Sequence, residues 1–294
     1  MKALYDVAAP AKLNLFLHVV GRRADGYHLL QSAFVLIDWC DSLHFEARRD
    51  GRLTRHDLAA ALPEDDLCLR AARALQMASG TALGVDISIA KQVPWGAGMG
   101  GGSSDAASTL LALNRLWRLD WPLSRLAKLG LELGADVPFF LGGHNALVEG
   151  IGERLTPLAL PPHQFAVLKP AASLATRAIF ESPRLVRSNA ADILAGFLAD
   201  AGSERLLQGW GRNDLQPPAE SVCAEVAQAA QLLEARFGNS RMTGSGSAVF
   251  ARAGKLDGAL GQPTATMPAD LPPGWVGRMC RSLEQHPLAG WARD

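Results

Sequence analysis

The stretch "PWGAGMGGGSSDAAST", residues 94–109, decides how the rest of the sequence is interpreted. Its glycines leave backbone N–H groups uncovered by side chains, and Ser103-Ser104-Asp105 is typical of a helix start. A helix N-terminus adds unpaired donors and roughly half a positive charge, which favours a bound anion. The stretch therefore predicts a phosphate-binding loop. Its residues are Pro94, Trp95, Gly96, Ala97, Gly98, Met99, Gly100, Gly101, Gly102, Ser103 and Ser104.

A flexible linker is the alternative, but the loop joins two regular elements. Val85, Ile87 and Ile89 alternate as in a strand before it, and a helical stripe over 106–117 follows it. The loop is neither a P-loop, since no lysine precedes the Ser/Thr, nor a dinucleotide loop with an acidic residue about 20 positions on.

The composition of the chain excludes several classes of function. The chain has 294 residues, is 48% hydrophobic and carries 29 basic and 29 acidic residues, so its formal net charge is zero. This argues against nucleic-acid binding through a broad basic surface. The four cysteines, Cys40, Cys68, Cys223 and Cys280, lack metal-site spacing. Because we find no secretory signal and no run of about 18 apolar residues, we expect a cytoplasmic protein that binds no membrane.

The first half reads as strands followed by helices. Leu13, Leu15 and Leu17 alternate with polar neighbours over 12–20, so Lys12 and Asn14 share one strand face. A turn follows at Asp25-Gly26, then two strand-like runs over 31–47, a helix from 67 and a strand over 85–90. A helix ending at Gly134, a second start at Asp136, and a strand and turn over 146–158 complete this half.

The second half begins after paired prolines in a predicted linker over 159–164. A strand over 165–170, helices over 190–201 and 224–238, and a strand–glycine turn–strand over 240–253 follow. We therefore predict an α+β protein with two domains, 1–157 and 158–294.

Three stretches resemble motifs of the superfamily of galactokinase, homoserine kinase, mevalonate kinase and phosphomevalonate kinase (the GHMP kinases). They are "APAKLNLFLHVVGRRADGYHLL", "PWGAGMGGGSSDAA" and "MTGSGSAVFA". Within the superfamily, the ordered motifs "PAKLNLFL", "RADGYH", "GGGSSDAA", "LGADVPFFL" and "EGIGERL" together look like the kinases that phosphorylate the tertiary 2-hydroxyl of 4-(cytidine 5′-diphospho)-2-C-methyl-D-erythritol in the non-mevalonate isoprenoid pathway. The resemblance implies ATP and Mg²⁺ as cofactors. It also implies an S5-like N-terminal domain, a ferredoxin-like C-terminal domain and an active site between them.

The resemblance assigns Asp136 as the catalytic carboxylate and Lys12 as its cationic partner. Phosphoryl transfer depends on positioning and charge stabilisation, with a carboxylate to accept or orient the hydroxyl proton. From the residues alone, Asp136 could instead be a helix N-cap and Lys12 a solvated strand lysine. An alternative function of a different class, a catalytically silent nucleotide-binding regulator, would be expected to lack one of the two.

The resemblance places the acceptor substrate on residues far apart in the sequence. Tyr27 and His28 would hold the cytosine, with Phe180 stacking opposite. The remaining substrate-binding residues implied are Asn14, Thr176, Gly244 and Ser245. Each aromatic could instead be core packing, and the 243–247 loop a plain hairpin turn.

Some positions depart from the family or stay open. Asp66 stands where the family often has asparagine near the adenine, which puts that contact in doubt. Residues 183–238 match no motif and receive no role. No acidic cluster marks a metal cage, so Ser103 or Ser104 with phosphate oxygens is the expected Mg²⁺ environment. A kinase of mevalonate or homoserine is the alternative within the fold, and a monomer and a homodimer are both compatible with the sequence.

Overall fold

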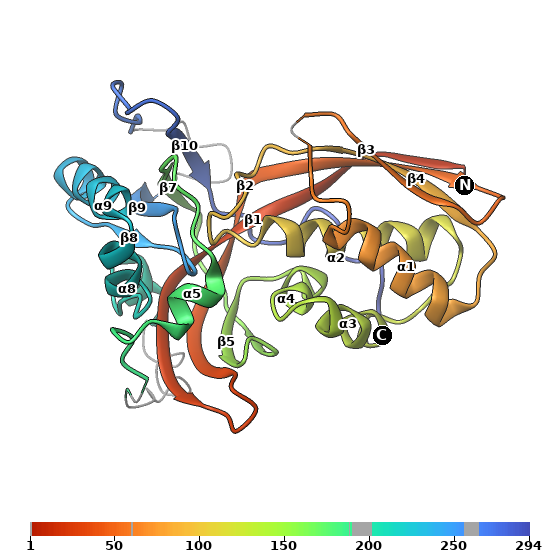
Figure 1. Cartoon of the computed structure of the whole chain (residues 1–294), viewed down its shortest axis with the longest axis horizontal. Coiled ribbons are helices and arrows are strands. Elements are labelled where there is room, and N and C mark those ends of the chain that lie inside the picture. Colours follow the sequence, from red (N-terminus) through yellow and green to blue (C-terminus); the bar gives the residue numbers. More distant parts are fainter. Residues whose placement is uncertain (1, 60, 188, 190–201, 256–264) are drawn as a thin grey trace.

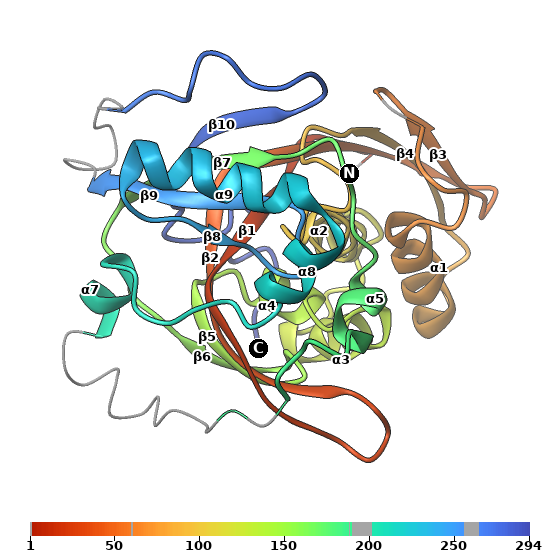
Figure 2. The ribbon, with the colours of Figure 1, turned by 60° about the vertical axis from the view of Figure 1, so that its left-hand side comes forward.

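The molecule is built on two β-sheets, and helices pack against each of them (Figure 1, Figure 2). The computed structural model describes residues 2–59, 61–187, 189, 202–255 and 265–294. Within these ranges no helix is long and apolar enough to cross a membrane.

The first sheet has the order β3-β4-β2-β5-β6, with β1 paired to β2. Helices α1, α2 and α4 pack on one face of it around a core that includes Leu75, Leu110 and Phe139. The strands are β1 (Ala3–Arg22), β2 (His28–Arg48), β3 (Leu53–Asp57), β4 (Gly84–Ala90), β5 (Ala146–Gly150) and β6 (Arg154–Pro157). The helices are α1 (Leu67–Ser79), α2 (Gly101–Leu116), α3 (Leu123–Leu133) and α4 (Val137–Gly142).

The second sheet has the order β10-β7-β9-β8. Along β7, Phe165 and Val167 pack against β1 and β2, whereas Ala166 and Leu168 pack toward α8 and α9, as strand alternation requires. Its strands are β7 (His163–Lys169), β8 (Arg241–Met242), β9 (Val249–Lys255) and β10 (Val276–Arg281). Its helices are α5 (Thr176–Glu181), α7 (Gly202–Leu207), α8 (Gln216–Val222) and α9 (Ala224–Phe237).

Residues of the long β1–β2 hairpin pack in two cores, the one between the first sheet and helices α1–α4 and the one between the two sheets. A register shift in the hairpin determines toward which side Lys12 points. Ala9 packs on the helix side, whereas Leu13 packs toward the second sheet. The shift lies between Pro10 and Ala11. Because a bulge exchanges the two faces of a strand, Lys12 turns to the side of α2 and α4.

The C-terminal residues return to the first sheet. The backbone N–H of Leu283 donates to the Leu36 carbonyl at 2.8 Å. Leu288 is buried in the core under α1–α4, and Trp291 packs against it. The C-terminus therefore lies near α3 (Figure 1). The domain boundary near residue 157 stays a prediction.

Most expected elements are confirmed. The strands over 12–20 and 85–90, the break at Gly134 and the strand–turn–strand over 240–253 are all present. So is the turn at Asp25-Gly26. The predicted helix over 190–201 lies outside the described residues.

Three expectations were wrong. Residues 31–47 form one strand, β2, rather than two runs, and its Asp38 and Asp41 side chains accept the backbone N–H groups of Arg281 and Val93. Helix α2 begins at Gly101 rather than at Ser103, because Gly100 takes the left-handed conformation that starts it. The expected linker over 159–164 ends early, since β7 begins at His163 and pairs with β9 and β10.

The packing between the sheets is testable at Phe165, which is fully buried beside Phe250, with ring centroids 5.9 Å apart. Phe165→Ala is expected to lower the free energy of unfolding by about 3–5 kcal/mol, because a large side chain is removed from a closed core. Urea unfolding measures the loss. Val222→Ala, at a position 66% exposed, is the control and should change stability by about 0.5 kcal/mol or less. Equal losses would contradict the packing.

Candidate active site

Lys12 and Asp136 meet between β1 and the start of α4. The Lys12 Nζ lies 3.5 Å from Asp136 Oδ2 and donates to Asn14 Oδ1 at 2.6 Å. It also lies 4.3 Å from the centre of the Phe34 ring. Burial lowers the pKa of Lys12, and the Asp136 carboxylate opposes this. The arrangement pairs a buried ammonium with a carboxylate that is 31% exposed.

Asp136 sits at the N-cap of α4, but its side chain makes no capping hydrogen bond. An N-cap aspartate usually accepts from a backbone N–H in the first turn. Here the carboxylate turns to Lys12 instead, so helix capping does not account for an aspartate at this position.

Backbone hydrogen bonds hold the glycine loop against strand β1 and against the segment before strand β9. The N–H of Lys12 donates to the Met99 carbonyl at 3.0 Å, and those of Ser247 and Ala248 donate to Gly96 and Ala97 at 3.1 Å each. These bonds exclude a loose linker. They bring the start of α2 beside Lys12, since a β carbon on Gly100 would lie 3.3 Å from Lys12 Cε.

The start of α2 offers unpaired polar atoms. Its N-cap, Gly100, has no side chain to cap the first turn, and the first N–H groups of any helix lack intrahelical acceptors. Ser104 Oγ is buried with no partner among the residues that the structure describes. Such a helix start suits a phosphate group.

The loop between β8 and β9 closes on Asn14. Asn14 Oδ1 accepts from the Gly244 N–H at 2.9 Å, its Nδ2 donates to Ser32 Oγ at 3.0 Å, and its N–H donates to Thr243 Oγ1 at 3.0 Å. The Asn14 amide is thus engaged by the protein, and its predicted contact with substrate stays a prediction. Asn213, in the stretch that received no role, holds the loop by donating to Gly244 O at 2.9 Å.

A second buried charge cluster, missed in the sequence, lies behind the glycine loop. The Lys91 ammonium contacts the carboxylates of Asp41 and, at 2.6 Å, Asp105. Asp41 Oδ1 also accepts the N–H groups of Gln92 and Val93 at 2.5 and 2.8 Å. Burial raises the pKa of Asp105. Because the members are 50 and 14 residues from Lys91, no local pattern indicates the cluster.

The predicted base-binding residues are partly brought together. The rings of His28 and Phe180 stack with centroids 5.0 Å apart and an angle of 30°. The Oγ1 of Thr176 and the Oγ of Ser245 are 2.8 Å apart and hydrogen-bonded. Tyr27, in contrast, is 60% exposed at the hairpin end.

Two residues that the sequence analysis placed near the nucleotide, Asp66 and Trp95, make hydrogen bonds to other parts of the protein. Asp66 caps α1 by accepting from the Leu69 N–H at 3.1 Å and pairs with Arg55 at 2.8 Å. Its carboxylate is thus committed to the protein. Trp95 is 61% exposed, and its carbonyl accepts from Ser173 Oγ at 3.3 Å.

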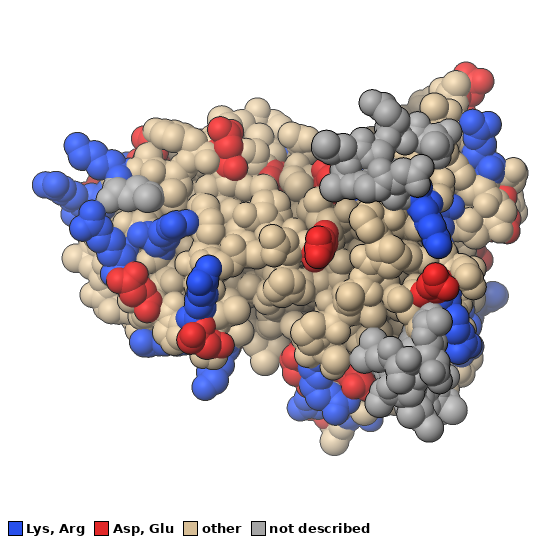
Figure 3. Space-filling view, turned by 180° about the vertical axis from the view of Figure 1, so that it is seen from behind, with Lys and Arg blue, Asp and Glu red and all other residues tan. Residues whose placement is uncertain are grey.

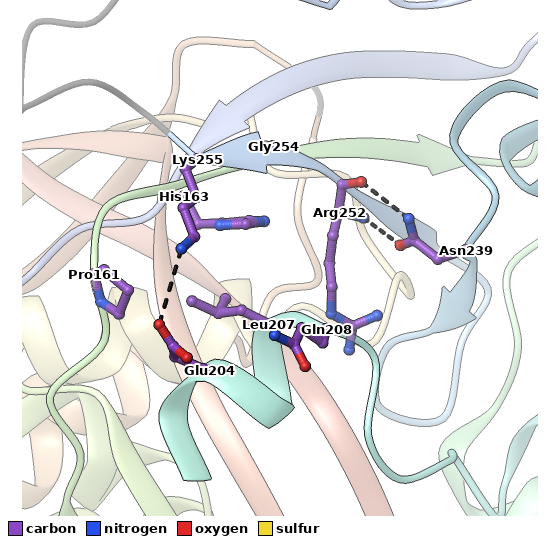
Figure 4. A pocket seen from close by; sticks show the side chains of 9 residues that line it. All are labelled: Pro161, His163, Glu204, Leu207, Gln208, Asn239, Arg252, Gly254 and Lys255. Atoms are coloured by element: carbon purple, nitrogen blue, oxygen red, sulfur yellow. Dashed lines mark hydrogen bonds and ion pairs between the residues drawn. The ribbon is translucent and has the colours of Figure 1, made fainter. Parts of the chain in front are cut away.

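A separate cavity of about 360 Å³ lies among β7, β9 and α7 (Figure 4). Its lining includes His163, Leu207 and Arg252, and the Lys255 and Glu204 side chains approach to 3.9 Å across its edge. None of the predicted site residues lines this cavity.

Comparison with known proteins shows the family and the fold of the chain. The description "GHMP kinases N terminal domain" matches residues 66–144, and "GHMP kinases C terminal" matches residues 192–260. The fold also resembles a crystal structure of homoserine kinase from Cytophaga hutchinsonii, with a TM-score of 0.68 and 16% identity over 97% of this chain and 96% of that one. The chain belongs to the GHMP kinases, and their two-part α+β fold is confirmed.

Two closer relatives narrow the family. A "4-diphosphocytidyl-2-C-methyl-D-erythritol kinase" of Methylibium petroleiphilum is 67% identical, over 99% of each chain. A crystal structure of 4-(cytidine 5′-diphospho)-2C-methyl-D-erythritol kinase is 36% identical with a TM-score of 0.70, over 87% of this chain and 90% of that one. Within the GHMP kinases, the chain is therefore a member of the 4-diphosphocytidyl-2-C-methyl-D-erythritol kinase family.

The contact between the two glycine loops is testable at Gly98. A β carbon there would lie 2.2 Å from the Thr243 carbonyl oxygen, so Gly98→Ala must push the loops apart. We expect kcat/KM for ATP to fall about 100-fold, as displacement of a substrate-positioning group by about 1 Å can cause. Gly80→Ala is the matched control, since Gly80 has a similar φ of 68° but no atom within 4 Å of its β carbon. It should lose only about 1 kcal/mol of stability. Equal kinetic effects would contradict the model of close loop contact.

The Lys91 cluster predicts unequal effects of its two carboxylates. Asp105→Asn should keep the free energy of unfolding within about 0.5 kcal/mol or raise it, because one carboxylate suffices to balance the buried ammonium. Asp41→Asn should cost about 1–3 kcal/mol, because its oxygen must stay on the two backbone N–H groups, which places the amide NH2 against the Lys91 ammonium. Urea unfolding at pH 7.5 compares them, and a larger loss for Asp105→Asn would refute this account.

Proposed function

We propose that this chain transfers the γ-phosphoryl group of ATP to the 2-hydroxyl of 4-(cytidine 5′-diphospho)-2-C-methyl-D-erythritol. The hydroxyl oxygen forms a bond to the γ-phosphorus, the bond from that phosphorus to the β–γ bridging oxygen breaks, and the hydroxyl proton passes to a carboxylate. The products are the 2-phosphate and ADP. The observation that carries the proposal is the Lys12–Asp136 pair at 3.5 Å beside the start of α2.

Asp136 is the proposed proton acceptor. Its carboxylate is free of helix capping and partly exposed, so a substrate hydroxyl can approach it. Proton transfer to a positioned base contributes typically about 10²–10⁴-fold to a rate.

Lys12 is the proposed electrostatic partner. An ammonium has three N–H donors; in the described part of the chain, Asn14 and Asp136 take two. The third can donate to the acceptor oxygen or to the phosphoryl group as negative charge develops there. We assign Asn14 to holding Lys12 and the loop at Gly244 in place, in addition to its predicted substrate contact.

The glycine loop and the N-terminus of α2 are the proposed seat of the ATP triphosphate, over Pro94 to Ser104. Support comes from the positive φ of Gly96, Gly98 and Gly100 and from the first turn of α2, which has no side-chain cap. Thr176, Phe180, Gly244 and Ser245, with Tyr27 and His28, are proposed to hold the cytidine diphosphate end.

Mg²⁺ is proposed as the second cofactor. No group of three or more His, Cys, Asp or Glu side chains able to hold a metal exists within the described ranges. The Oγ of Ser104, which has no partner among the described residues, fits a cation ligand shared with ATP phosphate oxygens, with Ser103 as its neighbour. When bound, the ion would neutralise phosphate charge.

We propose further that the protein is cytoplasmic, binds no nucleic acid, and acts as a monomer or homodimer of chains with domains 1–157 and 158–294. The formal net charge of zero supports the absence of nucleic acid. On the face in Figure 3, basic and acidic side chains are interspersed and the middle is mostly uncharged.

The reaction is testable by ADP release from the purified protein with three alcohols. We expect turnover with the cytidylylated methylerythritol and none with mevalonate or homoserine. Neither of these two alcohols carries a cytidine, so neither can occupy the proposed cytidine site. Turnover of mevalonate alone would overturn the proposal, and no turnover with any alcohol despite ATP binding would favour the silent regulator.

Asp136→Asn tests the proton acceptor. It should lower kcat by about 10²-fold or more while ATP affinity, measured by calorimetry, stays nearly intact. Because Asp136 opposes the lowering of the Lys12 pKa, the variant should also lower that pKa further, as followed by NMR of the lysine side chain. Asp120→Asn, at an exposed position whose φ of 49° asparagine tolerates, is the control. Unchanged kcat in Asp136→Asn would sink the assignment.

A further inference from the structure

Arg187 connects the two stacked rings of the predicted base site. Its Nη2 donates to the carbonyls of Phe180 and Ser182 at 2.9 and 2.8 Å, and its Nη1 to that of Leu185 at 3.2 Å. Its Nε lies 3.2 Å from Nε2 of His28, which is 159 residues away in sequence. The guanidinium is therefore fixed by the turn after α5 and aimed at one nitrogen of His28.

The direction of this hydrogen bond decides the protonation of His28. A guanidinium is always charged and has donors only. The Nε2 of His28 must therefore accept, which places the ring proton of the neutral imidazole on Nδ1. Burial, Arg187 and Arg22 together lower the pKa of His28, so the neutral form prevails at pH 7.

The other ring nitrogen is free to bind a ligand. In the part of the chain that the structure describes, Nδ1 of His28 has no hydrogen-bond partner. Phe180 stacks on the same ring, and its carbonyl is held by Arg187. One arginine thus fixes the tautomer of His28 and the segment that carries Phe180.

We propose that Arg187 is a positioning residue for base selection: it makes His28 an Nδ1–H donor, so that the site accepts a pyrimidine with an acceptor at N3. This rests on the proposed function. Cytosine has a lone pair at N3, whereas uracil carries an N3–H. With uracil two donors would oppose each other, and a donor left unpaired in the complex costs about tenfold or more in binding.

The tautomer can be tested in the unmodified protein. ¹⁵N NMR of the histidine side chains at pH 7.5 should show His28 protonated on Nδ1 and unprotonated on Nε2, with the signals assigned by their loss in His28→Gln. Protonation on Nε2 in the wild-type protein would overturn the proposal without any substrate. This measurement is independent of whether the proposed reaction is correct.

The selectivity is tested by kcat/KM for the cytidine substrate and its uridine counterpart. Arg187→Met, which cannot donate, should reduce the cytidine preference about tenfold or more, mainly through KM, and shift His28 toward Nε2 protonation. Arg187→Lys, which retains a donor, should restore part of both effects. Arg184→Met, at an exposed arginine in the same segment, should change neither.

The outcomes separate the two hypotheses. An unchanged cytidine preference in a folded Arg187→Met variant, with melting temperature as the check of folding, would overturn the role of Arg187. If the wild-type protein turns over neither substrate, the proposed function fails, while the tautomer measurement still decides whether Arg187 fixes the tautomer of His28.

Discussion

Gly98 and Gly244 meet backbone to backbone, at a separation that leaves no room for a β carbon on either residue. A β carbon on Gly98 would lie 2.2 Å from the Thr243 carbonyl oxygen, and one on Gly244 would lie 2.5 Å from that of Gly98. The position of Asn14, Lys12 and the start of α2 depends on this contact, since all are bonded to one of the two loops. The glycines therefore provide close approach of main chains as well as freedom of φ.

The buried charge clusters around Lys91 and Lys12 differ in the solvent exposure of their carboxylates. Around Lys91, both carboxylates are buried and one of them also holds backbone N–H groups. Around Lys12, the carboxylate of Asp136 is partly open to solvent. Burying charge costs free energy unless partners are complete. The closed cluster suits a structural role and the open one suits chemistry.

Local pattern was enough to predict the elements that carry the site. The period of two in 12–20 placed Lys12 and Asn14 on one face, and both lie there. The start of α2 was misplaced because a left-handed glycine, rather than a serine side chain, begins the helix. The continuity of β2 was missed because the partners of Asp38 and Asp41 come from distant strands and loops.

Contacts between distant residues explain the rest. The resemblance supplied Lys12, Asp136 and His28 as candidates, but neither it nor any pattern indicated that Arg187 donates to His28 or that Asn213 holds Gly244. Such side chains occur in segments without motifs, and only the folded chain shows what they touch. Their identity could not be predicted from one sequence.

The return of residues 282–294 to the first sheet has a consequence for synthesis. Because Leu288 is buried in the core under α1–α4, that core stays incomplete while the chain is being made, even though its strands and helices are translated first. A chain that stops before residue 282 would expose apolar surface on the helices of the glycine loop, a state prone to aggregation. The core that carries helix α2 and the glycine loop is thus completed only after residues 282–294 have been translated.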